Sequence, residues 1–182
     1  MLDSINTTVA AQLKNARHKK GWSLDVASQH CGVSKAMLGQ IERGESSPTI
    51  ARLWKIATGF ALPLSDFLEQ KNESETTRSH VKGLSEGNAI SIETIFDYDA
   101  ITNLEVFDLT LAIGHEQHSE AHQKGVVEHI IVTSGSMEYY IDGKWNRLNT
   151  GDKAKFAADK NHAYRNVGQL PLRFLNIIYY PK

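Results

Sequence analysis

The spacing of apolar residues changes midway along the chain, and this change predicts two domains. Over residues 1–69, apolar side chains recur at the three- and four-residue intervals of amphipathic helices. Over residues 89–182, short β-branched and aromatic runs alternate with turn signals such as Asp142-Gly143. Residues 70–88 are polar and nearly free of large apolar side chains, which is the composition of a linker. The pattern therefore predicts an α+β chain in which a linker joins a helical domain to an all-β domain.

The helical domain contains the pattern of a helix-turn-helix. A first helix is predicted to end at Gly21, and Ser23 is placed to cap the next helix with its hydroxyl. Gly32-Val33-Ser34 then supplies a glycine that can take a positive φ, an apolar residue for the corner and a second cap. A connection this short between two helices is characteristic of the helix-turn-helix motif, which binds DNA.

The helix predicted at 35–43 is expected to read DNA. Leu38 and Ile41 share the face that anchors it to the domain, which leaves the opposite face exposed. In a helix-turn-helix, the second helix enters the major groove, where lysine and glutamine donate to base edges and apolar groups contact thymine methyls. The residues predicted to reach the DNA bases are Lys35, Ala36, Met37, Gly39 and Gln40.

Flanking residues complete the predicted DNA interface. Glycine costs a helix interior about 1 kcal/mol relative to alanine, so Gly39 is expected to serve a close approach of the backbone to DNA. Phosphate contacts are expected from the end of this helix and from the loop that follows it. The remaining residues predicted to bind DNA are Ser23, Ser34, Arg43, Ser46 and Ser47. The alternative is an ordinary amphipathic surface helix whose polar side chains are merely solvated.

The helical half resembles a known family of DNA-binding domains. The stretch GWSLDVASQHCGVSKAMLGQIERGESSPTIARLWKIATGFALPLSDFL resembles, from end to end, the five-helix domain of the phage-repressor-like XRE family. This resemblance implies that Arg17 on the first helix pairs with Glu42 at the end of the DNA-reading helix. The pair is expected to stabilise the domain rather than to contact DNA.

Composition adds little about DNA but constrains the cellular compartment. A net charge of −1 does not by itself indicate a nucleic-acid partner, so the DNA prediction depends on the local pattern. A single cysteine, Cys31, cannot close an intramolecular disulfide, which fits a reducing compartment. No apolar run approaches the roughly 18 residues that cross a bilayer, and the first ten residues lack the features of a signal peptide. The protein is therefore expected to be cytoplasmic.

The chemistry of the second half is concentrated in one stretch. Residues 115–129, HEQHSEAHQKGVVEH, hold four of the eight histidines in the chain, together with three glutamates. Side chains alternate between the two faces of a strand, so Glu128, Ile130 and Val132 are predicted to point inward together. His129 is then predicted to point outward. The stretch indicates a metal site, and the alternative is a histidine-rich, solvated loop.

This half resembles the cupin β-barrel. The order is His122, five residues, Glu128, six residues and a glycine, and further on a glycine, ten residues, His162, three residues and Asn166. Two departures from the usual cupin motifs stand out. Glu120 occupies the place of the first histidine, and the gap from His122 to Glu128 is one residue longer than usual. In the second motif, Ala157 and Asp159 replace the usual proline and glycine, and some cupins have lost their metal.

The cupin resemblance implies a set of two histidines and one carboxylate. His122, Glu128 and His162 would hold a divalent metal and leave open positions on it, with zinc as the first candidate and iron, manganese and nickel also compatible. Tyr164 follows His162 on the same strand face and is expected to form a wall of the ligand pocket. Two further side chains are candidate alternative ligands: Glu120, which is also predicted to contact the small molecule, and His118.

Taken together, the two halves resemble XRE-cupin regulators of sulfur utilisation. GVSKAMLGQIER, ESSPT, LWKIATG, HQKGVVEH and FAAD carry this likeness. It implies a homodimeric transcription regulator that senses a sulfur compound, such as methionine or cysteine. Two alternatives remain open at this point: a cupin enzyme, resembling a dioxygenase of sulfur amino acids, with a DNA-binding appendage, and a metal-free barrel that serves only dimerisation.

Overall fold

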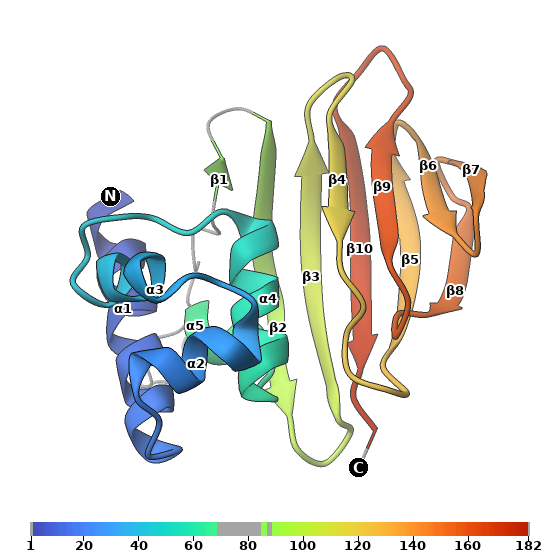
Figure 1. The fold of residues 1–182 in the computed structure, drawn as a ribbon. Helices are drawn as coiled ribbons and strands as arrows, with labels where there is room; N and C mark the ends of the chain where they lie inside the picture. Colours follow the sequence, from blue (N-terminus) through green and yellow to red (C-terminus); the bar gives the residue numbers. More distant parts are fainter. Residues whose placement is uncertain (1, 69–84, 87–88, 182) are drawn as a thin grey trace. The chain divides into compact units, whose positions relative to one another are not determined.

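The computed structural model describes residues 2–68, 85–86 and 89–181, and Figure 1 traces their helices and strands. The chain divides into two compact units, Met1–Gly83 and Leu84–Lys182. Most of the segment predicted as a linker, 70–88, lies outside the described residues. Its described part, Ser85–Glu86, forms a short strand, β1, because its backbone pairs with Ser91 and Ile90. Among the described residues, no helix is both long and apolar enough to cross a membrane.

The described part of the helical unit contains five helices, the number that the resemblance to the XRE family implies. They are α1 (Leu2–Lys19), α2 (Leu24–Cys31), α3 (Lys35–Glu42), α4 (Ile50–Phe60) and α5 (Ser65–Leu68). Each of the longer helices turns an apolar face inward, so that a single core forms between them. The core side chains that are at most 1 % exposed include Leu13, Leu38, Ile41, Leu53, Ile56, Phe60 and Phe67.

Capping hydrogen bonds fix the first turns of α2 and α3, as the sequence predicts. The Ser23 hydroxyl accepts from Val26 N at 3.2 Å, and the Ser34 hydroxyl accepts from Met37 N at 3.3 Å. Gly32 takes a φ of 63° between the two helices, in the region that glycine adopts without strain. The helix α3 ends at Glu42 rather than at residue 43, because Arg43 forms its C-cap.

The end of α3 is held by an ion pair with α1. Arg17 Nε donates to Glu42 Oε1 at 2.6 Å and Nη2 donates to Oε2 at 2.8 Å, so the contact is bidentate. Arg17 Nη1 also donates to the carbonyl oxygen of Trp22 at 3.0 Å. The side chains are only 14 % and 7 % exposed. The pairing implied by the family resemblance is therefore confirmed, and it stabilises the position of α3, the predicted DNA-reading helix.

The second unit is built of antiparallel strands in two sheets. After β1 they are β2 (Ile90–Asp99), β3 (Leu104–Leu111), β4 (Glu116–Ser119), β5 (Val127–Ser134), β6 (Ser136–Ile141), β7 (Lys144–Asn149), β8 (Lys153–Ala157), β9 (His162–Asn166) and β10 (Leu172–Tyr179). The larger sheet has the order β1-β2-β3-β10-β5-β8, and the smaller has the order β4-β9-β6-β7. This is the all-β cupin architecture predicted from the sequence, and Figure 1 shows the long strands side by side.

The chain passes from the larger to the smaller sheet at Gly135, between β5 and β6. Gly135 has a φ of 88°, and a Cβ there would lie 3.1 Å from both Leu172 Cα and Pro171 O. Within β5, Glu128, Ile130 and Val132 are buried while His129 is half-buried on the opposite face. The strand parity predicted from the sequence is therefore confirmed, and it directs one carboxylate into an otherwise apolar interior.

Replacement of Arg17 by methionine is expected to destabilise the helical unit, because it leaves the Glu42 carboxylate partly buried and uncompensated. We expect a loss of about 2–3 kcal/mol, below the range of about 3–5 kcal/mol for a fully buried pair. The double variant Arg17→Met/Glu42→Leu should recover much of this loss, as measured by a denaturant double-mutant cycle. Arg43→Met is the matched control, because the Arg43–Glu45 pair is more than half exposed. Additive losses in the cycle would contradict the pairing.

Candidate functional site

The predicted DNA-reading face of α3 is largely open to solvent. Lys35, Ala36 and Gln40 are exposed, and Met37 is half-buried. Lys35 Nζ pairs with Asp25 Oδ2 at 2.8 Å, but both side chains are about 60 % exposed. Exposed pairs of this kind contribute little free energy. Lys35 can therefore leave Asp25 for a DNA acceptor at small cost.

Gly39 is less exposed than the other residues predicted to reach the DNA bases. It is buried, and a Cβ at this position would lie 3.1 Å from Arg43 Nη1 and 3.7 Å from Leu24 Cδ1. Residue 39 follows Leu38 directly and lies on the border between the buried and exposed faces of α3. A Cβ there would make an ordinary contact with Leu24 of α2 and a tight one with the flexible end of Arg43. The burial of Gly39 was not expected from the sequence, whereas its role in a close approach of the backbone to DNA stays a prediction.

Several of the other predicted DNA contacts also make local interactions. The hydroxyls of Ser23 and Ser34 accept from backbone N–H groups, so each O–H remains able to donate to a phosphate. Arg43 forms a bidentate pair with Glu45 at 2.7 and 2.6 Å. The Ser46 hydroxyl donates to the Met37 sulfur at 3.7 Å, whereas Ser47 is exposed.

Two basic side chains beside this face were not predicted from the sequence. A groove of about 390 Å³ runs between the helix-turn-helix corner and the start of α4, and Arg52 and Lys55 line it together with Ser34 and Thr49. The Thr49 hydroxyl caps α4 by accepting from Arg52 N at 3.1 Å. The missed signal is a pair of basic residues, Arg52 and Lys55, of which the first stands three positions after a capping threonine. Their charge and place suit contacts with phosphates.

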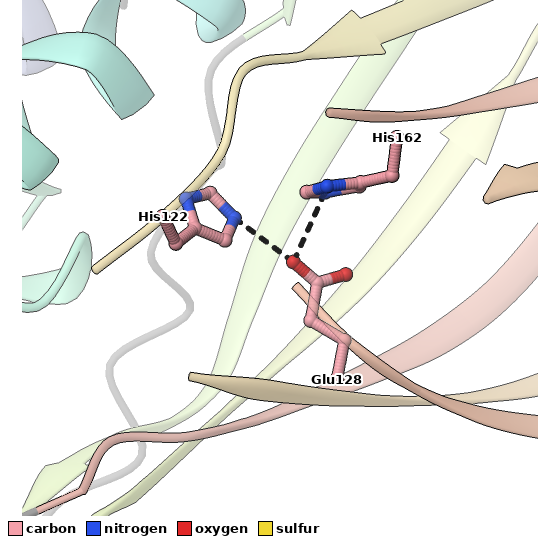
Figure 2. A group of neighbouring side chains, drawn as sticks. All are labelled: His122, Glu128 and His162. Carbon is pink, nitrogen blue, oxygen red and sulfur yellow. Dashed lines mark hydrogen bonds and ion pairs between the residues drawn. The ribbon is translucent and has the colours of Figure 1, made fainter. Parts of the chain in front are cut away.

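In the β unit, three donor side chains converge in the interior. His122 comes from the loop between β4 and β5, Glu128 from β5 and His162 from β9. One ligand atom from each lies within 4.8 Å of the other two, and Figure 2 shows both imidazoles directed at the carboxylate. The side chains are 6 %, 1 % and 1 % exposed. The three residues that the cupin resemblance implies are thus brought together from both sheets.

The distances within this cluster fit a shared cation. His122 Nε2 lies 2.9 Å from Glu128 Oε1, and His162 Nε2 lies 3.3 Å from the same oxygen. Nitrogen and oxygen ligands bind zinc at about 2.0–2.2 Å, so adjacent ligand atoms are about 3–3.5 Å apart. The donor set therefore has both the chemistry and the spacing of a divalent metal site. Within it, Glu128 Oε1 faces both nitrogens.

The tautomer of His162 supports the same conclusion. Its Nδ1 lies 2.8 Å from the carbonyl oxygen of Lys160, which can only accept, so Nδ1 carries a proton. In the neutral ring, Nε2 then presents a lone pair to the carboxylate oxygen of Glu128, and the two lone pairs repel each other. A metal ion or a second proton between them removes this repulsion. Burial lowers the pKa of His162, but the Glu128 carboxylate outweighs burial and raises it.

The second oxygen of Glu128 is held by donors of the protein. Asn176 Nδ2 donates to Oε2 at 3.0 Å, and the hydroxyl of Tyr164 donates to the same oxygen. Burial favours the neutral acid, but His162 and His122 outweigh it and hold the pKa of Glu128 well below its usual range. Burial and the adjacent carboxylate raise the pKa of Tyr164 well above its usual value, so its hydroxyl stays a donor.

Some residues make contacts at this site that differ from those predicted. Tyr164 was expected as a pocket wall, but its hydroxyl binds Glu128 directly. Asn176 was not predicted; the signal was a polar residue at an inward position of the alternating run LRFLNIIYY. Glu120 and His118 are exposed and lie outside the cluster. His118 Nε2 instead pairs with Glu116 Oε1 at 2.7 Å.

An aromatic wall, also missed from the sequence, borders the cluster. The ring of Phe156 lies 5.5 Å from that of His162 and stacks on Tyr139 at 5.6 Å, measured between centroids. Phe156 is on β8 and Tyr139 on β6, so the wall joins the two sheets. Its position beside the donor atoms gives the site an apolar border.

These features define a class of protein: a helix-turn-helix DNA-binding unit followed by a cupin barrel. Residues 13–67 match the family model described as Helix-turn-helix, and residues 107–178 match the one described as Cupin domain. Over 181 residues the chain is 41 % identical to the HTH-type transcriptional regulator SutR of Escherichia coli (strain K12). The match spans 100 % of this chain and 99 % of SutR. The chain therefore belongs to the XRE-type helix-turn-helix transcriptional regulators with a cupin domain, and it is similar to SutR.

Solved structures agree with this assignment. An HTH_3 family transcriptional regulator from Vibrio cholerae matches with a TM-score of 0.90 at 41 % identity, over 100 % of both chains. The Cupin_2 domain of an XRE family transcriptional regulator from Enterobacter cloacae matches at 38 % identity and a TM-score of 0.51, over 52 % of this chain and 99 % of that domain. SinR of Bacillus subtilis (strain 168) is 31 % identical over 68 residues, 37 % of this chain and 61 % of SinR.

The relatives are transcriptional regulators by name, and this chain is a regulator rather than an enzyme. The resemblance to XRE-cupin regulators is therefore confirmed, and the alternative of a cupin enzyme with a DNA-binding appendage is set aside. The helix-turn-helix assigns DNA as a partner, and the cupin domain supplies a His/Glu cluster that can hold a metal ion.

The metal content of the protein is expected to depend on the three converging residues. Protein purified without chelator should carry about one divalent metal ion per chain, and His162→Ala should lose it, as measured by elemental analysis. Tyr164→Phe should retain the metal with an affinity lower by about 10–100-fold, because Glu128 Oε2 loses a donor that orients the carboxylate. His118→Ala is the matched control, since this side chain is 72 % exposed. Equal metal loss in His118→Ala and His162→Ala would contradict the assignment.

Proposed function

We propose that this regulator binds operator DNA through α3 and senses a small molecule through a divalent metal in its cupin domain. The observation that carries the proposal is the buried cluster in which His122 Nε2 and His162 Nε2 both face Glu128 Oε1. The Lys160 carbonyl fixes the proton of His162, and Tyr164 holds the other carboxylate oxygen. Because both the His162 ring and the Glu128 carboxylate are oriented by further hydrogen bonds, the cluster fits metal binding better than a structural ion pair.

The proposed ligands are His122, Glu128 and His162, each of which would give one atom. When bound, the metal would supply open coordination positions to a small ligand with nitrogen, oxygen or sulfur donors. Zinc is our first choice, because two imidazoles and a carboxylate suit it. The same donors also accept iron, manganese or nickel. The protein itself contributes orientation, through Lys160 and Tyr164, and exclusion of water, through burial.

We propose a sulfur compound, with methionine and cysteine as leading candidates, as the small molecule. The amino and carboxylate groups of an amino acid form a chelate that matches open positions on a metal. The wall of Phe156 and Tyr139 beside His162 supports a sulfur-containing side chain, since thioethers pack favourably at aromatic rings. Glu120, which is exposed, remains a proposed contact at the entrance.

On DNA, we propose a homodimer that places two α3 helices about 34 Å apart in successive major grooves. A single short helix reads too few bases to select a site alone. Lys35 and Gln40 are the proposed donors to bases, and Ala36 and Met37 the proposed apolar contacts. The proposed phosphate contacts are Ser23, Ser34, Arg43, Ser46, Ser47, Arg52 and Lys55. Binding to operator DNA also supports a cytoplasmic location.

The replacement Gln40→Ala is expected to reduce discrimination at one base position by about 1–3 kcal/mol, because glutamine can bond adenine N6 and N7 together. The measurement is a binding-site selection followed by titration of single-base operator variants at fixed salt. Gln29→Ala, an exposed glutamine on α2, is the matched control and should leave the base preference unchanged. Unaltered affinity and preference in Gln40→Ala would show that another face reads the bases.

Ligand binding is expected to depend on the metal. At 100 times its dissociation constant, a ligand should stabilise the folded protein by about 2.7 kcal/mol, which is visible as a thermal shift. We would titrate methionine, cysteine and leucine into metal-loaded protein, chelator-stripped protein and His122→Ala. Equal shifts in all three preparations would exclude a role for the metal, and leucine matching methionine would remove the case for sulfur. Regulation further requires that ligand affinity differ between free and operator-bound protein.

A further inference from the structure

The face of the larger sheet that points away from the barrel interior carries both apolar and charged side chains; we refer to it as the outer face. Residues paired directly across neighbouring antiparallel strands lie on the same face, so the registers define two adjacent rows that cross β2, β3, β10, β5 and β8. The first row is Glu93, Asp108, Leu175, Ile131 and Lys153, and the second is Phe96, Val106, Ile177, His129 and Lys155.

A groove occupies one half of the outer face. It has a volume of about 500 Å³ and runs over β5, β8 and β10, where His129, Ile131 and Ile177 form its floor and Lys153 and Lys155 its rim. The floor residues are half-buried, and the two lysines are exposed. An apolar groove of this size on a sheet that faces away from its own core indicates a binding surface.

A protruding apolar side chain occupies the other half of the outer face. Phe96, on β2, is 68 % exposed, although it pairs with Val106 in the sheet. A β-bulge on each side of Phe96 interrupts the register of β2. The protrusion and the groove therefore lie on the same face but at opposite edges of the sheet, as the strand order in Figure 1 shows.

The two edges also differ in charge. Glu93 and Asp108 lie at the β2–β3 side. Arg173 Nη2 lies 2.6 Å from Asp108 Oδ2 and neutralises that carboxylate, so Glu93 gives this side a net negative charge. Lys153 and Lys155 give the β8 side a positive charge. A rotation by 180° about an axis along β10 would exchange the two edges. It would bring the negative edge of one copy over the positive edge of another.

We propose that the outer face binds the outer face of a second copy of this chain through a two-fold axis parallel to β10. The partner's Phe96 enters the groove lined by His129, Ile131 and Ile177, and the partner's Glu93 meets Lys153. Because the contact is isologous, each pairing forms twice, which is the usual geometry of a homodimer. The inference deepens the proposed function, since it rests on the homodimer proposed there and assigns its interface.

Sedimentation equilibrium of the full chain, over a range of concentrations, tests this interface. We expect wild type to dimerise and Phe96→Asp to raise the dimer dissociation constant at least tenfold. Lys153→Glu should also weaken the dimer, and the double variant Glu93→Lys/Lys153→Glu should restore it, because both interfacial pairs are then reversed. Ile101→Asp is the matched control: Ile101 is 86 % exposed but lies in the β2–β3 turn, outside both rows. Thermal unfolding verifies that each variant is folded.

The outcomes separate this inference from the proposed function. If Phe96→Asp and Lys153→Glu remain as dimeric as wild type, the interface lies elsewhere and the proposal is overturned, while the homodimer stands. A wild type that is monomeric at every concentration overturns both the interface and the homodimer, but not metal binding. If Lys153→Glu dissociates the dimer and the double variant does not recover it, the pairing of Glu93 with Lys153 is wrong. Variants that alter protease cleavage between the two units without altering mass would indicate that the face binds the chain's own helical unit instead.

Discussion

The buried carboxylate of Glu128 is the constraint around which the β unit is arranged. An ionised carboxylate without partners in an apolar interior would cost many kcal/mol, so every lone pair must be matched. Its partners come from the loop after β4, from β9 and from β10: His122, His162 with Tyr164, and Asn176. Because β9 belongs to the smaller sheet and β5 and β10 to the larger, these contacts join the two sheets. The same contacts thus set the geometry of the candidate metal site and hold the two sheets of the barrel together.

In the helical unit, comparable contacts fix the position of α3, the predicted DNA-reading helix. The Ser34 cap fixes the first turn of α3, and the bidentate contact from Arg17 to Glu42 fixes its last turn. Leu38 and Ile41 bury the side that faces the core. The helix is therefore held at both ends and along one face before it meets DNA. Little conformational freedom then remains to be lost on binding, which favours affinity.

Local patterns predicted those features that depend on local physics. The cap at Ser34 follows from the preference of serine for helix N-termini, and the inward position of Glu128 follows from the alternation of side chains along a strand. The XRE and cupin resemblances supplied what periodicity could not, namely the Arg17–Glu42 pair and the convergence of His122, Glu128 and His162. The two-domain α+β architecture was likewise predicted before any strand pairing was known.

The features that sequence reasoning missed depend on long-range register. Asn176 reaches Glu128 because β10 pairs with β5 in a register that no local pattern encodes. The burial of Gly39 was also missed, because a helical wheel does not show that Leu24 of α2 lies beside this border position. The strand β1 falls in a segment whose composition is that of a linker, and only its pairing with β2 orders it.

Glu128 is both a candidate metal ligand and the acceptor for two buried donors, and this limits how such a barrel can change over evolution. Loss of the carboxylate alone would leave the Tyr164 hydroxyl and the Asn176 amide without their acceptor in a buried place, which is costly. Loss of one histidine removes a ligand but leaves the acid with its remaining partners. A related barrel that binds no metal would therefore tend to keep Glu128, Tyr164 and Asn176 as an internal polar cluster. In such proteins, the presence of both histidines, rather than of the glutamate, would indicate that the site binds an ion.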